Sequence, residues 1–241
     1  MLEGQKVVVF GGSSGAGLAS AKLLASKGAE VIVAGRGAEK LDTKKELGAK
    51  GSAFAVDGKD VAAVHAFFEK IGAFDHLVIS AGATNRGGEF VTSITDATFR
   101  ETFDGKFWVQ ITAAHAGARR IKKGGSITFF SGGANRRALK GMVNIAAVNG
   151  ALDAVVPTLA LELAPTRVNA ISPGTLRTSY WTGVSDAQQE QIFGHLASVL
   201  PAGRVGTADD IANAVLFLVT TSYVTGTVLA VDGGLPHAGS L

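Results

Sequence analysis

The chain has 241 residues, 46% of them hydrophobic and 18% charged, and 23 Lys plus Arg against 20 Asp plus Glu give a formal charge of +3. This length and composition predict one domain with a substantial core, and the dispersed basic residues do not favour a nucleic-acid-binding surface. The absence of cysteine excludes disulfides and cysteine-based metal sites or nucleophiles.

Short apolar runs alternate with helical stretches along the chain. The expected strands are 6–10, 30–35, 52–56, 76–80, 126–131, 167–172 and 227–232. The expected helices are 15–27, 39–48, 60–72, 96–122, 142–163, 186–197 and 208–220. Six strands are apolar nearly throughout, as in strands buried on both faces of a parallel sheet. The alternation predicts an α/β fold: a single-domain, Rossmann-like, doubly wound sheet of seven parallel strands with helices on both faces.

A glycine-rich turn connects the first strand to the first helix. Gly11, Gly15 and Gly17 form G-x-x-x-G-x-G, and the second strand follows at the distance expected of a βαβ unit. Glycines let the backbone approach a pyrophosphate, which binds at the helix N-terminus. The pattern therefore favours a dinucleotide site over a merely structural turn.

The second strand ends in Gly35-Arg36 rather than in an acidic residue. An acid there binds the ribose 2′-hydroxyl, whereas an arginine pairs with a 2′-phosphate. We therefore expect NADP(H) to be preferred over NAD(H), with Ser13 or Ser14 assisting. The alternative is that Arg36 is an ordinary solvated surface charge.

The longest interruption of the pattern, residues 175–206, leaves the sixth strand at its carboxyl end. Ligands of open α/β sheets bind at that edge, so this segment is interpreted as a substrate lid. Arg136, Arg137 and Lys140 lie in the loop after the fifth strand, where they either attract an anionic substrate or remain solvated.

No membrane span, targeting segment or metal site is expected. The apolar runs are interrupted by Asn, Asp, Pro or Glu before eighteen residues, and no signal-peptide pattern opens the chain. The five histidines are scattered and do not suggest a metal-ligand cluster. These features predict a cytoplasmic protein without a membrane partner.

The chain resembles the short-chain dehydrogenase/reductase family over essentially its whole length. The glycine motif resembles the family's T-G-x-x-x-G-x-G with Phe10 in place of threonine, and "ISAGA" (79–83) is similar to N-N-A-G-x. "RVNAISPGTLRT" (167–178) closely resembles R-V-N-x-x-x-P-G-x-x-x-T, and residues 223–234 resemble the closing strand.

The resemblance implies further cofactor contacts. Asp57 matches the acid that touches the adenine, and Ser80, Ala81 and Gly82 fall in the motif after the fourth strand. The nicotinamide end would be held by residues at the end of the sixth strand and the start of the lid: Pro173, Gly174, Leu176 and Thr178.

The same resemblance locates four catalytic positions, all of them substituted. "NGALDAVVPTLALELAP" fixes the register, so Ile145 occupies the tyrosine position and Asn149 the lysine position. Gly132 stands at the serine position, with Ser131 one residue earlier, and Lys106 stands where the family has asparagine. An isoleucine cannot give a proton, so the source of the proton is the open question.

Lys106 and Asn149 occupy the family's asparagine and lysine positions, as though the two residue types had exchanged places. We hypothesise that Lys106 enters the cleft and donates the proton, with Ser80, Ser131 or lid residue Tyr180 assisting, while Asn149 binds ribose hydroxyls. The alternative is a lysine on a solvated helix face. A separation above about 8 Å between the Lys106 ammonium and the Asn149 amide would exclude the exchange, because one water could not bridge it.

These features predict an NADP(H)-binding oxidoreductase of the short-chain type that transfers hydride to or from a small carbonyl or alcohol. The competing reading is a cofactor-binding protein without significant turnover, such as a redox sensor or a structural partner. Apolar surface on helices 96–122 and 142–163 predicts a homodimer or homotetramer.

Overall fold

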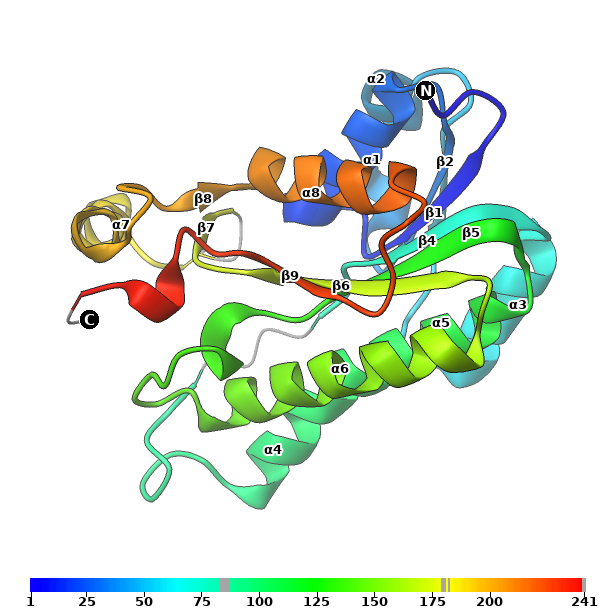
Figure 1. Cartoon of the computed structure of the whole chain (residues 1–241). Coiled ribbons are helices and arrows are strands. Elements are labelled where there is room, and N and C mark those ends of the chain that lie inside the picture. Colours follow the sequence, from blue (N-terminus) through cyan, green and yellow to red (C-terminus); the bar gives the residue numbers. More distant parts are fainter. Residues whose placement is uncertain (83–86, 179–180, 182, 240–241) are drawn as a thin grey trace.

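The computed structural model describes residues 1–82, 87–178, 181 and 183–239. Its centre is a parallel sheet of seven strands in the order β3-β2-β1-β4-β5-β6-β9 (Figure 1). Chain order reverses between β1 and β4, which is the doubly wound arrangement, so the predicted fold is confirmed. The strands are β1 (Lys6–Phe10), β2 (Glu30–Gly35), β3 (Ser52–Ala55), β4 (Phe74–Ile79), β5 (Ile121–Phe130), β6 (Arg167–Pro173) and β9 (Val228–Val231).

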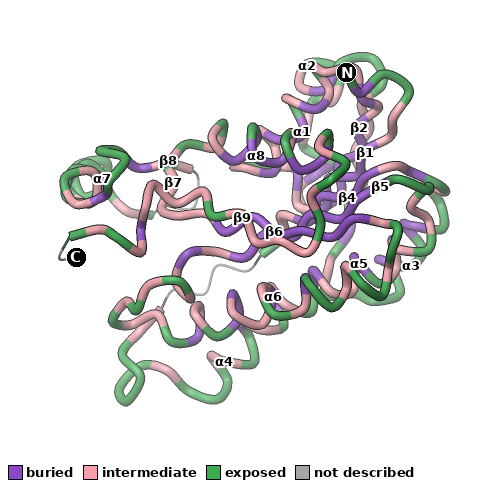
Figure 2. The backbone as a smooth tube through the Cα atoms, in the orientation of Figure 1, coloured by how far each residue is buried: buried purple, intermediate pink, exposed green. Residues whose placement is uncertain are grey.

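Helices cover both faces of the sheet, and alternate strand residues contact opposite layers. Val8 and Phe10 pack with α3 (Val61–Ile71), α5 (Trp108–Ala118) and α6 (Val143–Glu162). Val7 and Val9 pack with α1 (Gly15–Ser26) and α8 (Ala208–Thr220). Because side chains alternate along a strand, continuous apolar runs such as that of β1 fill two cores at once. Figure 2 shows the sheet as the buried centre between these layers.

Most predicted element boundaries agree with the structure within a few residues, but β5 is longer than expected. It begins at Ile121, which pairs with Phe74 across an irregular register, and not at residue 126. The predicted helix 39–48 is divided into a 3-10 turn (Ala38–Lys40) and α2 (Thr43–Leu47), which Asp42 caps by accepting from Lys45 N–H.

The prediction of one continuous helix over 96–122 is wrong. The segment consists of α4 (Asp96–Thr102), a π-helical turn (Phe103–Phe107) and α5, which ends at Ala118. A π turn widens the helix by one residue and so rotates the following helix relative to the preceding one. This turn carries Lys106.

Helix α6 runs without interruption through Pro157. By length and composition alone it is apolar enough to cross a membrane, with a mean hydropathy of 1.4. It lies along the sheet in Figure 1, and its buried residues include Asn144 and Asn149. Asn144 donates to the Thr102 hydroxyl at 2.9 Å, so polar groups on the inner face of α6 connect it to α4.

The segment predicted as a lid has its own small core. Helix α7 (Asp186–Val199) is preceded by β7 (Leu176–Arg177) and followed by β8 (Gly206–Thr207), and these two short strands pair in parallel. Phe193 is buried on α7, and the Trp181 ring packs edge-on against its ring, with 5.2 Å between the ring centroids. The Arg177 guanidinium lies over the same ring at 4.4 Å.

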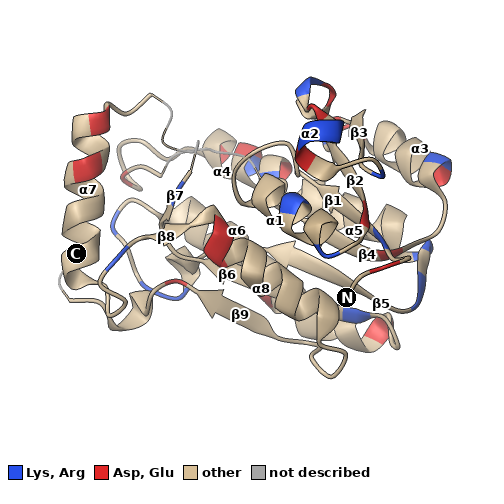
Figure 3. Cartoon of the chain, turned by 90° about the horizontal axis from the view of Figure 1, so that it is seen from above, with Lys and Arg blue, Asp and Glu red and all other residues tan. Residues whose placement is uncertain are grey.

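Charged side chains lie mainly at the surface. In Figure 3, Lys and Arg are scattered among Asp and Glu around the rim of the molecule. Several form exposed ion pairs, including Arg204 with Asp210 at 2.7 Å. Such exposed pairs contribute at most about 1 kcal/mol each, so the fold rests mainly on its two apolar layers.

Candidate active site

The glycine-rich loop packs directly on the end of β4. A Cβ at Gly11, whose φ is +95°, would lie 2.4 Å from the backbone nitrogen of Ala81. A Cβ at Gly17 would lie 2.3 Å from Ser80 Oγ. Side chains at either position would push the loop away from β4, so these glycines are needed for the close approach.

The N-terminus of α1 opens onto the loop. Ser14 is its N-cap, and within the described part of the chain its side chain makes no capping hydrogen bond; the first turn contains no acidic residue. Backbone N–H groups at a helix N-terminus then remain available to an anion, and the helix dipole favours one. This end of the helix fits a pyrophosphate.

A cavity of about 600 Å³ extends from this loop along the carboxyl edge of the sheet. That volume lies in the range of small-molecule and cofactor sites. It brings together most of the predicted cofactor residues: Gly11, Ser13, Ser14, Gly15, Gly17, Arg36, Asp57, Ser80, Ala81, Gly82 and Thr178.

Four other predicted cofactor residues do not line this cavity: Asn149, Pro173, Gly174 and Leu176. Gly174 is held at the end of β6, where its N–H donates to Val231 O at 3.1 Å. Leu176 pairs with Gly206 in the small lid sheet, and its carbonyl accepts from Trp181 Nε1 at 2.9 Å. Pro173, Gly174 and Leu176 form the connection between the sheet and the lid, whereas Asn149 lies on α6.

Lys59 is a cavity residue that the sequence analysis missed. It follows Asp57-Gly58 directly after β3, and its N–H donates to Asp57 Oδ1 at 3.0 Å. The sequence contained one signal for this role: Lys59 stands two positions after Asp57, just beyond the carboxyl end of β3. With Arg36 it gives this end of the cavity two cations, suited to an anionic group.

Lys106 does not itself line the cavity, but it follows the lining residue Gly105 and its side chain lies beside Gly82, which also lines it. A Cβ at Gly82 would lie 3.5 Å from Lys106 Cγ, so the lysine stem runs along the motif after β4. Its Nζ donates to the carbonyl of Ser131 at 2.6 Å and to Asn149 Oδ1 at 2.7 Å. The ammonium and the amide are therefore in direct contact. Their separation is well below the 8 Å above which the exchange of the two residue types would be excluded.

The environment of Lys106 lowers the pKa of its ammonium from 10.5 to about 8. The main cause is burial, which disfavours the charged form, and the negative charge of Asp153 opposes it. Asp153 lies one turn after Asn149 on α6, where Asn135 Nδ2 donates to its Oδ2 at 2.7 Å. A lysine with this pKa exchanges its proton near neutral pH.

The backbone of Gly132 lies close to the side-chain amide of Asn149. A Cβ at Gly132 would lie 2.9 Å from Asn149 Nδ2, closer than ordinary carbon–nitrogen contacts. A serine at 132 would therefore displace the amide that accepts from Lys106. Three of the four substituted positions thus form one contact set, whereas Ile145 is a partly buried side chain without polar atoms.

The two described serines that were predicted to assist proton donation both make hydrogen bonds to backbone carbonyls. The Ser131 side chain is buried and donates weakly to Ile171 O at 3.4 Å, so the residue serves Lys106 through its carbonyl. The Ser80 hydroxyl donates to Gly11 O at 3.0 Å and so connects β4 to the glycine loop. Tyr180 lies outside the described residues.

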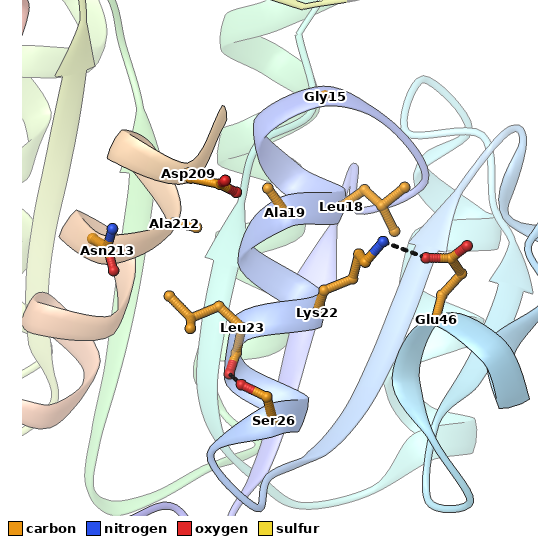
Figure 4. Close-up of a pocket in the computed structure, with 10 residues that line it drawn as sticks. All are labelled: Gly15, Leu18, Ala19, Lys22, Leu23, Ser26, Glu46, Asp209, Ala212 and Asn213. Atoms are coloured by element: carbon orange, nitrogen blue, oxygen red, sulfur yellow. Dashed lines mark hydrogen bonds and ion pairs between the residues drawn. The ribbon is translucent and has the colours of Figure 1, made fainter. Parts of the chain in front are cut away.

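A second depression, of about 710 Å³, lies on the solvent side of α1, between α2 and α8 (Figure 4). The Lys22 ammonium and the Glu46 carboxylate pair across it at 2.6 Å. Of the predicted site residues only Gly15 lines this depression, whereas eleven of the predicted cofactor residues line the first cavity, which is therefore the candidate cofactor site.

Comparisons with known proteins show the family to which the chain belongs. The family model described as enoyl-(acyl carrier protein) reductase matches residues 11–236. The 3-oxoacyl-[acyl-carrier-protein] reductase of Escherichia coli strain K12 is 32% identical over 246 residues, which cover 97% of this chain and 98% of that protein.

Solved structures give the same assignment. A small-chain dehydrogenase in complex with NADPH has 40% sequence identity and a TM-score of 0.84, over 96% of this chain and 98% of that one. A short-chain dehydrogenase from Burkholderia cenocepacia J2315 in complex with NADP has 30% identity and a TM-score of 0.84, over 97% and 98% of the chains. The chain therefore belongs to the short-chain dehydrogenase/reductase family of oxidoreductases.

Proposed function

We propose that the protein is an NADP(H)-dependent oxidoreductase that transfers hydride to or from a small carbonyl or alcohol, with Lys106 as its proton donor and acceptor. The observation that carries this proposal is the contact between Lys106 Nζ and Asn149 Oδ1 at 2.7 Å, beside the nucleotide cavity. We also propose that the whole chain acts as one nucleotide-binding domain, with residues 175–206 as its lid.

The described residues fit a nicotinamide dinucleotide. The N-terminus of α1 faces the glycine loop, and Arg36 and Lys59 line the end of the cavity where the second and third strands finish. When bound, the cofactor supplies the hydride for reduction of a carbonyl carbon, or accepts it in the reverse direction. The protein must supply the proton.

Lys106 is suited to supply that proton. Its ammonium has three N–H donors, two of which bind Ser131 O and Asn149 Oδ1, and we assign the third to the substrate oxygen. With a pKa of about 8 the ammonium predominates at pH 7, and it is acidic enough to protonate an oxygen that gains negative charge. The two acceptors hold the nitrogen in place throughout.

The competing function is cofactor binding without turnover, as in a redox sensor. It is favoured by Gly132 and Ile145, which provide no hydroxyl at two positions where the family has one. An assay of NADPH oxidation over a panel of aldehydes, diketones and quinones separates the two. Turnover with any member supports the oxidoreductase, whereas tight NADPH binding with no turnover across the panel supports the sensor.

The cofactor preference is predicted to depend on Arg36. We expect NADPH to bind at least about tenfold tighter than NADH, a difference of about 1.4 kcal/mol, and Arg36→Ala to remove most of this difference. The reason is loss of the guanidinium partner of the 2′-phosphate. Titration calorimetry with both cofactors measures it, with Arg100→Ala, an exposed arginine of α4, as the matched control. Equal affinities in the unmodified protein would disprove the preference.

The assembly is predicted to be a symmetric homodimer or homotetramer. Large apolar side chains remain exposed on the outer helices: Trp108 on α5 is 54% exposed and Leu161 on α6 is 82% exposed. Apolar surface of this kind is commonly covered by a second subunit. Light scattering at micromolar concentration tests it, and a particle of 24.6 kDa would refute it.

A further inference from the structure

The side of α6 that borders the loop after β5 carries two polar residues one turn apart, Asn149 and Asp153. The loop follows this side of the helix closely. A Cβ at Gly132 would lie 2.9 Å from Asn149 Nδ2, and a Cβ at Gly150 would lie 3.9 Å from Asn135 Cβ. Asn135 Nδ2 then donates to Asp153 Oδ2 at 2.7 Å. The loop therefore borders both the amide and the carboxylate.

The Asp153 carboxylate carries a charge that its hydrogen-bond partner does not balance. The side chain is half-buried, and its Oδ2 accepts from Asn135, which is a neutral amide. Its Oδ1 is buried and accepts no hydrogen bond from the residues that the structure describes. Within the same part of the chain the carboxylate forms no ion pair. A carboxylate removed from water in this way is costly unless a positive charge lies nearby.

The Lys106 ammonium has the opposite unbalanced charge. Its acceptors, Ser131 O and Asn149 Oδ1, are uncharged, and it forms no ion pair with any described residue. The ammonium is therefore bound to the residue one helical turn before Asp153. Opposite charges stabilise one another more strongly in such surroundings than at the surface. Accordingly, Asp153 raises the pKa of Lys106, against the larger lowering effect of burial.

Among the described residues, Asp153 is the charged group that acts on the Lys106 ammonium. The charged residues nearest to the lysine in the chain are exposed: Arg100, Glu101 and Asp104. In the loop after β5, Arg136 is exposed and Arg137 binds carbonyl groups of the C-terminal segment. The other titratable residues of the surrounding helices and strands lie toward the far ends of these elements: Asp75, His76, Asp96, His115, Lys122, Lys123 and Glu162.

We propose that Asp153 is the counter-charge of Lys106, a positioning residue that keeps the amine in the ammonium form from which it can give a proton. The proposal rests on the proposed reductase function and explains how a lysine buried in the site remains charged at neutral pH. Asn135 contributes by holding the carboxylate in place. Because a negative charge favours the protonated amine, loss of the Asp153 charge shifts the lysine toward its neutral form.

Asp153→Asn tests the proposal, because it removes the charge and keeps an oxygen that can accept from Asn135. Protonation of Lys106 is followed by carbon NMR of protein labelled at the lysine Cε, whose resonance shifts when the amine loses its proton. Lys106→Arg identifies the signal by its absence. We expect the midpoint of the Lys106 titration to lie at lower pH in Asp153→Asn than in the unmodified protein. This measurement does not depend on turnover.

Two further variants separate the effect of the charge from that of the fold. Asp153→Ser is a second neutral replacement and should shift the midpoint in the same direction. Asp104→Asn removes an exposed carboxylate two residues before the lysine and should leave the midpoint unchanged, because solvent and salt screen an exposed charge. Melting temperature and NADPH affinity are measured to establish that each variant is folded. A folded Asp153→Asn protein in which Lys106 titrates as in the unmodified protein would overturn the proposal.

The pH profile of reduction distinguishes this inference from the proposed function. If Lys106 gives the proton, the alkaline fall in kcat/KM should move to lower pH in Asp153→Asn by as much as the NMR midpoint does. A midpoint that moves without a matching change in the rate profile, or without any turnover, would overturn Lys106 as the proton donor and keep its counter-charge. An unmoved midpoint in a protein that turns over would overturn the counter-charge and keep the reductase. An unmoved midpoint without turnover would overturn both.

Discussion

Lys106→Met is expected to lower kcat/KM for carbonyl reduction at least about 100-fold, because general acid catalysis typically contributes 10²–10⁴. Methionine has a similar length but has no proton to give, and it leaves Ser131 O and Asn149 Oδ1 without their donor. Steady-state kinetics at pH 7 measure the loss. Lys123→Met, which removes an exposed lysine of β5, is the matched control and should retain full activity.

The loss of activity must be distinguished from a loss of cofactor affinity. NADPH affinity of Lys106→Met should stay within about threefold of the unmodified value, because Arg36, Lys59 and the N-terminus of α1, which are the proposed anion-binding groups, are unchanged. A folded Lys106→Met protein that retains full activity would contradict the catalytic role, even though the contact with Asn149 exists.

The direction of the reaction should determine how the rate depends on pH. For reduction the required form is the ammonium, so kcat/KM should be constant below pH 8 and fall about tenfold per pH unit above the pKa of about 8. For oxidation the required form is the neutral amine, so the rate should rise through the same range and then level off. By pH 10 the loss in reduction reaches about 100-fold.

Both profiles are measured with one ketone–alcohol pair from pH 6 to pH 10, with the cofactor saturating. Burial causes most of the pKa shift, so the midpoint should change little with ionic strength. A reduction rate that stays level to pH 10 would contradict the assignment of Lys106 as the acid.

The fold could be predicted from the sequence because its signals are local and strong. Apolar runs such as Val7–Val9 identify buried parallel strands, and the spacing of Gly11, Gly15 and Gly17 identifies the turn between β1 and α1. These features depend on residues close together in the chain. The position of Lys106 near Asn149 followed from a resemblance that fixed the register of both segments.

Several site features could not be predicted, because they depend on side-chain direction or helix geometry. Helical periodicity continues through residues 103–107, so the π turn that carries Lys106 leaves no mark in the sequence pattern. Nothing in the neighbouring residues shows that the Ser131 hydroxyl faces β6 while its carbonyl faces the lysine.

Arg137 illustrates the same limit for long-range contacts. It accompanies Arg136 and Lys140 in a loop, and the three look alike as surface charges. Only the fold brings carbonyl groups about one hundred residues away to the Arg137 guanidinium. The role of a charge is set by the partners that the tertiary structure supplies, which a single sequence does not contain.

The central claim, that the Lys106 amine carries the proton, has a direct chemical test. Because the chain contains no cysteine, Lys106→Cys introduces one thiol, which 2-bromoethylamine converts in the unfolded state into an aminoethyl side chain of lysine length. Its sulfur withdraws electrons, so its amine is less basic than that of lysine. We expect the unmodified Lys106→Cys protein to be inactive, and the refolded aminoethylated protein to regain reduction with the alkaline fall shifted to lower pH. Restored activity with an unshifted profile, or no recovery in a protein that binds NADPH normally, would contradict the account.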